Sequence, residues 1–248
     1  MWDVVAFYEN QASSSSLVAV QAVSDDVYVT SGDDLIIKPD KKLVLFAFGY
    51  SGNIFQGQLR APVLGQLYEE IPVFQNPAYT RDFPFDEWFV RRRLVLRENE
   101  ALNAYVASAD GGTAEDEFVV VALGRAPINR NVRFDYVLRL TGSTTLSVGA
   151  WTKVTLTPDV TLPEGRYRIV GMRAYSPGAV AVRIIPLSGS DRPGFPGARN
   201  KHMLDVNIKN YLGDTGVVFT PRAIPKVEYL ALSADTSQIV YWFLKKVG

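Results

Sequence analysis

Cysteine is absent from the 248 residues, which excludes disulfide bonds, thiolate metal sites and cysteine nucleophiles together. The chain has one histidine, His202, and no Gly-x-Ser-x-Gly turn that would present a nucleophilic serine. The residue spacings of calcium-binding loops and of phosphate-binding loops are also missing. We therefore expect no metal, no cofactor and no enzymatic activity, with His202 as an exposed loop residue.

Long apolar runs are missing too. The longest, Leu43–Tyr50, has the length of a buried strand and falls far short of the roughly 18 residues that a membrane-spanning helix needs. The start of the sequence has neither the basic nor the apolar segment of a secretory signal, so we expect none. The net charge of zero argues against packing of nucleic acid by a basic surface.

This zero net charge hides two halves of opposite sign. Residues 1–124 carry 9 Lys and Arg against 18 Asp and Glu, whereas residues 125–248 carry 17 against 8. Complementary charges steer association and fix its register. Two interpretations stay open: the halves meet, within one chain or between subunits, or two solvated surfaces simply differ in sign.

What the sequence has in abundance are residues that favour strands, including 13 Phe and 12 Tyr. The stretch Leu162–Pro186 predicts a complete β-hairpin, because two β-rich runs are joined across Ser176-Pro177-Gly178, where Pro fixes φ and Gly can adopt a positive φ. An earlier counterpart is Lys38–Pro62. Its Tyr50-Ser51 pair stands 125 residues before Tyr175-Ser176.

A second match occurs at the same offset. The triplets Ser108-Ala109-Asp110 and Ser233-Ala234-Asp235 each follow a strand-like run with a tyrosine and precede an apolar run. The sequence therefore predicts one β unit written twice, as a domain duplication. We place an N-terminal arm at 1–24, the first unit at 25–124 and the second at 125–248. The expected strands are 27–30, 35–38, 43–50, 54–59, 88–96, 101–107 and 118–123, then 132–140, 144–148, 151–157, 166–175, 179–187, 217–220, 227–233 and 239–244.

Seven or eight short strands in each unit fit a two-sheet sandwich, and the eight-stranded form of this sandwich is the jelly roll. The duplication is carried by PDKKLVLFAFGYSGNIFQGQLRAP against LPEGRYRIVGMRAYSPGAVAVRIIP and by the paired Ser-Ala-Asp triplets. It resembles the double jelly-roll major capsid proteins of icosahedral double-stranded DNA viruses and membrane-containing phages. The resemblance implies an all-β fold of two tandem eight-stranded jelly rolls.

The resemblance also implies a function and partners. The chain would be a structural protein of the virion, assembled in the host cell cytoplasm into homotrimers with a pseudo-hexagonal outline, which then form a capsid lattice. Minor capsid proteins and an internal lipid membrane, reached through the N-terminal arm, would be further partners, and nucleic acid would not be bound directly.

Two groups of residues are candidates for these contacts. The second hairpin is richer in arginine than the first, and we expect it to contact an acidic neighbouring subunit, because contacts in a cyclic trimer are heterologous. These interface candidates are Arg166, Arg168, Arg173 and Arg183. The contact candidates of the N-terminal arm, which packs on its own domain or docks on a neighbour or a lipid surface, are Trp2, Phe7 and Tyr8.

Two other functions remain open from the residues alone. A carbohydrate-binding, lectin-like protein of two β-sandwiches, such as a virion appendage, would stack sugar rings on aromatic loop residues, unless these form hydrophobic clusters under the loops. Those residues are Tyr68, Phe74, Tyr79, Phe83 and Phe195. A glycosidase would need a carboxylate pair, and the candidates by residue type are Glu69 with Glu70 and Glu98 with Glu100.

Overall fold

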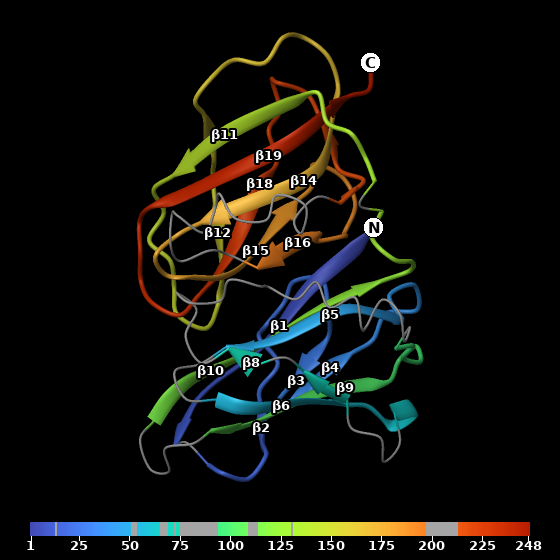
Figure 1. Cartoon of the computed structure of the whole chain (residues 1–248), viewed down its shortest axis with the longest axis vertical. Coiled ribbons are helices and arrows are strands. Elements are labelled where there is room, and N and C mark those ends of the chain that lie inside the picture. The colour runs from blue at the N-terminus through green and yellow to red at the C-terminus, as the bar shows by residue number, and fades with distance from the viewer. Residues whose placement is uncertain are drawn as a thin grey trace. The chain divides into compact units, whose positions relative to one another are not determined.

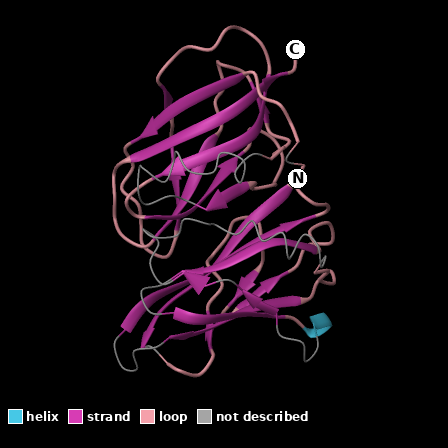
Figure 2. Ribbon diagram, in the orientation of Figure 1, coloured by secondary structure: helices cyan, strands magenta, loops and turns pink. Residues whose placement is uncertain are grey.

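The computed structural model describes residues 1–12, 14–50, 54–64, 69–71, 73–74, 94–108, 114–129, 131–196 and 213–248. These residues form strands joined by loops, with one short 3-10 turn at Pro62–Leu64 (Figure 2). In this part of the chain no helix has the length and apolar character needed to cross a membrane. The chain divides into two compact units, the first at Val4–Pro127 and the second at Ile128–Gly248, and Met1–Asp3 group with the second.

The second unit is a jelly roll (Figure 1). Its strands are β11 (Tyr136–Gly142), β12 (Trp151–Val154), β13 (Thr157–Pro158), β14 (Tyr167–Tyr175), β15 (Ala179–Ile185), β16 (Gly194–Pro196), β17 (Val218–Phe219), β18 (Lys226–Ala231) and β19 (Gln238–Lys246). One sheet has the order β13-β11-β19-β14-β17 and the other β12-β18-β15-β16. If β13 is left out and the rest are lettered B to I along the chain, the sheets read B-I-D-G and C-H-E-F, which is the jelly-roll order.

The first unit repeats this order. Its strands are β1 (Trp2–Ala12), β2 (Val18–Val20), β3 (Thr30–Ser31), β4 (Asp34–Ile36), β5 (Leu43–Tyr50), β6 (Ile54–Arg60), β7 (Glu69–Ile71), β8 (Val73–Phe74), β9 (Ala101–Ser108) and β10 (Ala114–Gly124). One sheet is β1-β10-β5-β8, and in the other β2 and β4 pair with β9, which is followed by β6 and β7. Apart from the β3–β4 hairpin, these strands again give B-I-D-G and C-H-E-F. The predicted fold class is confirmed.

One strand departs from the regular arrangement. Neighbours in a jelly-roll sheet run antiparallel, but β8 runs parallel to β5, with Gly49 opposite Val73. Because β8 follows β7 after a single residue, the chain has no room to reverse its direction between them. The sheet of the first unit is therefore irregular at its edge.

The duplication seen in the sequence relates equivalent strands. The hairpin Lys38–Pro62 contains β5 and β6, and Leu162–Pro186 contains β14 and β15, which occupy positions D and E of their jelly rolls. The first residues of β6 and β15, Ile54 and Ala179, are 125 residues apart. The first Ser-Ala-Asp triplet begins at the last residue of β9 and the second comes shortly after β18, and both strands are at position H of their units. The second triplet closes on the hairpin turn of its own unit, because Ser176 Oγ donates a hydrogen bond to Asp235 and Leu232 N donates one to Gly178 O at 2.8 Å.

Each unit buries its own core between its two sheets. In the first, Val5 and Phe7 of β1 belong to one cluster with Val44, Val121 and Leu102, which come from three other strands, and all five are essentially inaccessible to solvent. In the second, aromatic rings bridge the strands. Tyr167 packs on Phe219 with ring centroids 6.1 Å apart, and Phe219 packs edge-to-face on Trp242 at 5.4 Å. Each buried side chain of this size contributes about 1.5–3 kcal/mol, so the cores dominate the stability of the units.

The predicted N-terminal arm at 1–24 requires a correction. Residues 2–12 form β1, which lies beside β10 as position B of the first jelly roll, and 18–20 form β2 at position C. The run Trp2–Phe7 is buried without alternation, so it has the pattern of a strand covered on both faces and not of a free segment. The expected start of the first unit at residue 25 is therefore too late.

Several strand predictions also need correction. Residues 26–28 form a bend closed by Asp25, whose side chain accepts hydrogen bonds from the backbone N–H of Val27 and Tyr28. Residues 144–148 make only an isolated bridge at Val148. Of the expected strand 88–96, residues 88–93 lie outside the described part, as do most of the two long connections and His202.

Candidate interaction surfaces

The strongest electrostatic feature is a buried ion pair in the second unit. Arg183 of β15 lies opposite Glu228 of β18, and Arg183 Nε donates a hydrogen bond to Glu228 Oε2 at 2.7 Å. The side chains are 1% and 3% exposed. The guanidinium also lies 4.0 Å from the ring centre of Trp151 on β12, which is the strand on the other side of β18. This geometry combines a charge-assisted hydrogen bond with a cation–π contact, so Arg183 is held within its own unit.

The other predicted interface arginines lie in three different settings. Arg166 is exposed just before β14 begins. Arg168 is half-buried and its Nε donates a hydrogen bond to Asp214 Oδ1 at 2.6 Å. Arg173 is 7% exposed in the middle of the strand. The expected basic face of four arginines is therefore not formed, since Arg173 and Arg183 are buried, and the subunit contact stays a prediction that concerns Arg166 and Arg168.

The three N-terminal candidates are engaged within the chain. Trp2 is 2% exposed, its indole N–H donates a hydrogen bond to Gly194 O at 3.1 Å, and its ring meets Phe195 edge-to-face at 5.5 Å. Phe7 belongs to the core of the first unit. The ring of Tyr8 packs on that of Phe118 in a tilted arrangement, with centroids 4.7 Å apart. The sequence left open whether these residues contact their own domain, a neighbouring subunit or a lipid surface. In the structure, all three side chains pack within the chain itself.

An acidic cluster that the sequence analysis missed lies where β1 ends and β10 begins. Asp116 accepts hydrogen bonds from Tyr8 Oη and Asn10 Nδ2, both at 2.8 Å, and Glu117 accepts one from Gln11 Nε2 at 2.6 Å. Burial raises the pKa of Glu117. Burial, with the Asp116 carboxylate, also raises the pKa of Tyr8 to about 12. The run Glu115-Asp116-Glu117 ahead of an apolar segment was the signal in the sequence.

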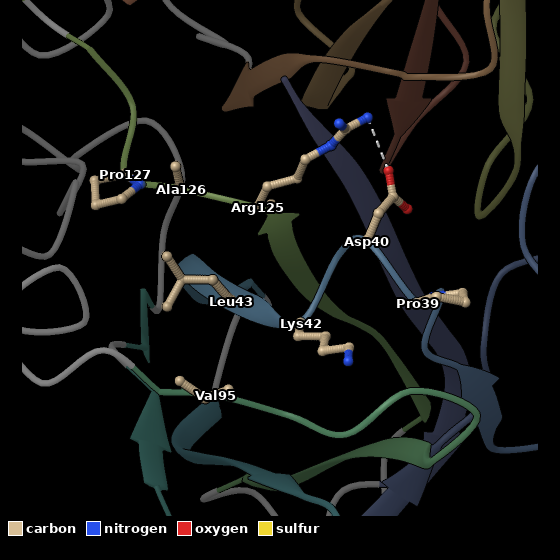
Figure 3. Close-up of a pocket in the computed structure, with 9 residues that line it drawn as sticks. Pro39, Asp40, Lys42, Leu43, Val95, Arg125, Ala126 and Pro127 are labelled. Atoms are coloured by element: carbon tan, nitrogen blue, oxygen red, sulfur yellow. Dashed lines mark ion pairs between the residues drawn. The ribbon is translucent and has the colours of Figure 1, made fainter.

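The first unit also has a pocket of about 520 Å³ where β5 begins and β10 ends. Figure 3 shows Leu43, Val95 and Pro127 on one side of it and the ion pair between Arg125 and Asp40, 3.0 Å apart, on the other. Its remaining cation, Lys42, lies 3.2 Å from Glu98. Because both cations are paired, the pocket is electrically balanced and mainly apolar, and nothing in the described residues indicates an occupant.

Most residues proposed for the two alternative functions either contact other residues of the chain or have side chains outside the described part. Glu98 pairs with Lys42, and Glu100 accepts hydrogen bonds from the backbone N–H groups of Val63 and Arg97. Phe195 is fully buried against Trp2. The side chains of Glu69, Glu70, Tyr68, Phe74, Tyr79 and Phe83 lie outside the described part. In the described residues, no group of three or more metal-ligating side chains is brought together.

The two strand orders place the chain in a defined class: it is a double jelly-roll protein, with two complete B-I-D-G and C-H-E-F sandwiches in tandem. Neither a protein-family model nor a curated protein matches its sequence. Among solved structures, it is similar to the crystal structure of the major capsid protein P2 from bacteriophage PM2. The match covers 100% of this chain and 98% of that chain, with 9% sequence identity and a TM-score of 0.25.

Proposed function

We propose that this chain is a major capsid protein whose trimers form the capsomers of an icosahedral virus shell. The observation that carries the proposal is the presence of two complete jelly rolls in one chain, with the same strand order in both. The jelly roll is the architecture of many viral capsid domains. Three such chains present six jelly rolls, which suits a pseudo-hexagonal outline.

The charge distribution supports a ring of this kind. In a cyclic trimer every contact joins two different surfaces of the chain. A first half of charge −9 and a second half of charge +9 favour a head-to-tail order over contacts between like halves. Arg166 and Arg168 are the proposed contact residues on the basic side. Arg173 and Arg183 are buried in their own unit and would act only by supporting its sheets.

The proposal includes location and further partners. The protein would be a component of the virion, assembled in the host cytoplasm, and minor capsid proteins would join its lattice. It would act as a structural protein, held in the shell by the surface that is buried between subunits. The carbohydrate-binding alternative has less support, because Phe195, its one aromatic candidate with a described side chain, is buried and cannot stack on a sugar.

The test is the oligomeric state of the purified full chain. Sedimentation velocity at low salt is expected to give a species of three times the mass of the chain, and electron microscopy is expected to show blocks with a hexagonal outline. Raising the salt should weaken the trimer, because contacts between charged surfaces are screened over about 8–10 Å at moderate ionic strength. A monomer at high concentration and low salt would refute the proposal.

A matched pair of variants tests the proposed contact. Arg166→Glu reverses an exposed charge on the basic side and should shift the equilibrium toward monomer. Arg97→Glu makes the same change at an exposed arginine of the first unit and should leave the trimer intact. Equal behaviour of the two variants would remove Arg166 from the contact without deciding against the trimer.

A further inference from the structure

The large sheet of the second unit ends in a distinctive surface. The segment Arg133-Phe134-Asp135 leads into β11 and lies beside the end of β19 (Figure 1). Asp135 N donates a hydrogen bond to Leu244 O at 2.7 Å, and Lys246 N donates one to Asp135 Oδ2 at 2.9 Å. These bonds fix two exposed strand ends side by side.

Three cations on these strand ends are exposed and form no ion pair with any described residue: Arg133, Lys245 and Lys246. Nearby arginines of the same unit behave differently. Arg139 pairs with Asp159, and Arg222 pairs with Glu164. Among the described side chains of these two strand ends, the three cations outnumber the carboxylate of Asp135.

Apolar side chains are exposed near these cations. Lys245 lies on the same face of β19 as Phe243, whereas Lys246, the next residue, projects from the other face at the strand end. Phe134, Val137 and Val247 are 39%, 49% and 42% exposed. The ring of Phe134 is supported from below, since it meets Phe243 at 5.0 Å, and Val137 lies opposite Phe243 in the strand register. We call the six residues the basic end surface: Arg133, Phe134, Val137, Lys245, Lys246 and Val247.

We propose that the basic end surface binds the anionic headgroups of a lipid bilayer. Uncompensated Lys and Arg beside exposed apolar side chains suit this partner, because the cations reach the phosphates and the apolar groups enter the boundary of the acyl chains. Nucleic acid would use the cations but would leave the apolar residues in water. A second copy of the chain fits less well, because lysine is depleted in protein–protein interfaces.

This role differs from the one predicted for the N-terminal residues. Trp2 and Phe7 are buried in the chain, whereas the basic end surface is exposed. Arg166 lies at its border, where its backbone N–H donates a hydrogen bond to Gly248 O at 2.8 Å. The binding is expected for the isolated chain as well as for an assembled shell, in which many copies on one particle would strengthen it by multivalency.

The experiment is flotation of the purified full chain with vesicles of phosphatidylcholine containing phosphatidylglycerol, and with vesicles of phosphatidylcholine alone. The protein should float with the anionic vesicles, and binding should fall as salt is raised. A cation near an anionic membrane contributes about a fivefold factor in affinity. Lys245→Gln with Lys246→Gln should therefore weaken binding by about 30-fold.

The matched control is Arg97→Gln with Lys226→Gln, which removes two exposed cations outside this surface. It should change binding by less than about twofold. Val247→Ser, which keeps all charges, should weaken binding to anionic vesicles by a few fold, whereas a bare phosphate site would not respond to it. Circular dichroism of every variant checks that the fold is kept.

Four outcomes would overturn the proposal. The wild type does not float with anionic vesicles, or the two double variants bind equally well. Alternatively, a DNA duplex or inorganic phosphate competes fully, which assigns the surface to free phosphate groups. Finally, the Lys245/Lys246 variant loses self-association in sedimentation without lipid, which makes the surface a contact between copies. Trimer formation is measured separately, so failure here leaves the capsid proposal standing.

Discussion

The buried pair Arg183–Glu228 allows a quantitative test of what holds the second unit together. Removing one partner leaves the other charge buried without compensation, which costs about 3–5 kcal/mol. Arg183→Gln and Glu228→Gln should each lower the free energy of unfolding by this amount. The double variant keeps a neutral amide at the positions of both hydrogen-bonding atoms, and because neutral hydrogen bonds have a net worth near 1 kcal/mol, it should cost less than either single change.

The assay is thermal unfolding followed by near-ultraviolet circular dichroism, with the transition of the second unit analysed separately because a two-unit chain need not unfold in one step. At about 2–4 °C per kcal/mol, each single variant should lower the Tm by roughly 6–20 °C. The double-mutant cycle should give a coupling energy of at least about 2 kcal/mol. If the two single losses simply add in the double variant, the pair is not a coupled unit and the reasoning fails.

Three further predictions concern the fold. Trp2→Ala should lower the free energy of unfolding by about 3–5 kcal/mol, because it leaves a cavity beside Phe195. A loss below about 1 kcal/mol in a denaturant titration would instead support a free arm. Gly178→Ala should lower the free energy of unfolding by about 1–3 kcal/mol or more, because the added Cβ would lie 2.1 Å from the backbone oxygen of Ser233. Ser188→Ala is the control in the same denaturation assay, and a smaller loss in Gly178→Ala than in this control would contradict the prediction. Burial raises the pKa of Glu117 in the folded state, so the ionised carboxylate lowers the stability of the fold. This penalty disappears as the pH falls toward the pKa of glutamate in the unfolded chain, about 4.3. Glu117→Gln should therefore be more stable than the wild type near neutral pH, with a gap that closes on acidification; a gap that widens in thermal unfolding at falling pH would show the opposite shift.

The regular parts of the fold could be predicted because their residues report local conformation. The run Leu43–Tyr50 forms a strand with these bounds, since eight consecutive apolar residues with turns on both sides suit a strand buried on two faces. The Ser-Pro-Gly turn and the 125-residue offset then fixed which strands are equivalent. In contrast, the order of strands within each sheet depends on contacts between distant residues, and only the resemblance to a known family anticipated it.

The failures have the same physical origin. Trp2–Phe7 was interpreted as an arm because it precedes the repeated segments, but its place in a sheet is decided by β10, more than 100 residues later in the chain. Arg173 and Arg183 were assigned to a surface because arginine is rarely buried without a partner. The partner of Arg183 is Glu228. The signal in the sequence is a single charged residue inside each of two apolar runs, positive in one and negative in the other.

Comparison of the two units indicates how this pair could be accommodated. The 125-residue offset relates Arg183 to Gln58 and Glu228 to Asn103, but the strand register differs between the units. Arg183 lies opposite Glu228, whereas Gln58 lies opposite Tyr105 and Asn103 lies opposite Arg60. Both units nevertheless stack an arginine on an aromatic ring near these strands: Arg60 lies 3.7 Å from the ring centre of Tyr105, and Arg183 lies 4.0 Å from that of Trp151. Either charge alone would cost several kcal/mol in a buried position, whereas the two together cost little. The arginine–aromatic contact is thus common to both units, whereas the directly opposed Arg–Glu pair belongs to strands E and H of the second unit, where loss of either charge alone would be costly.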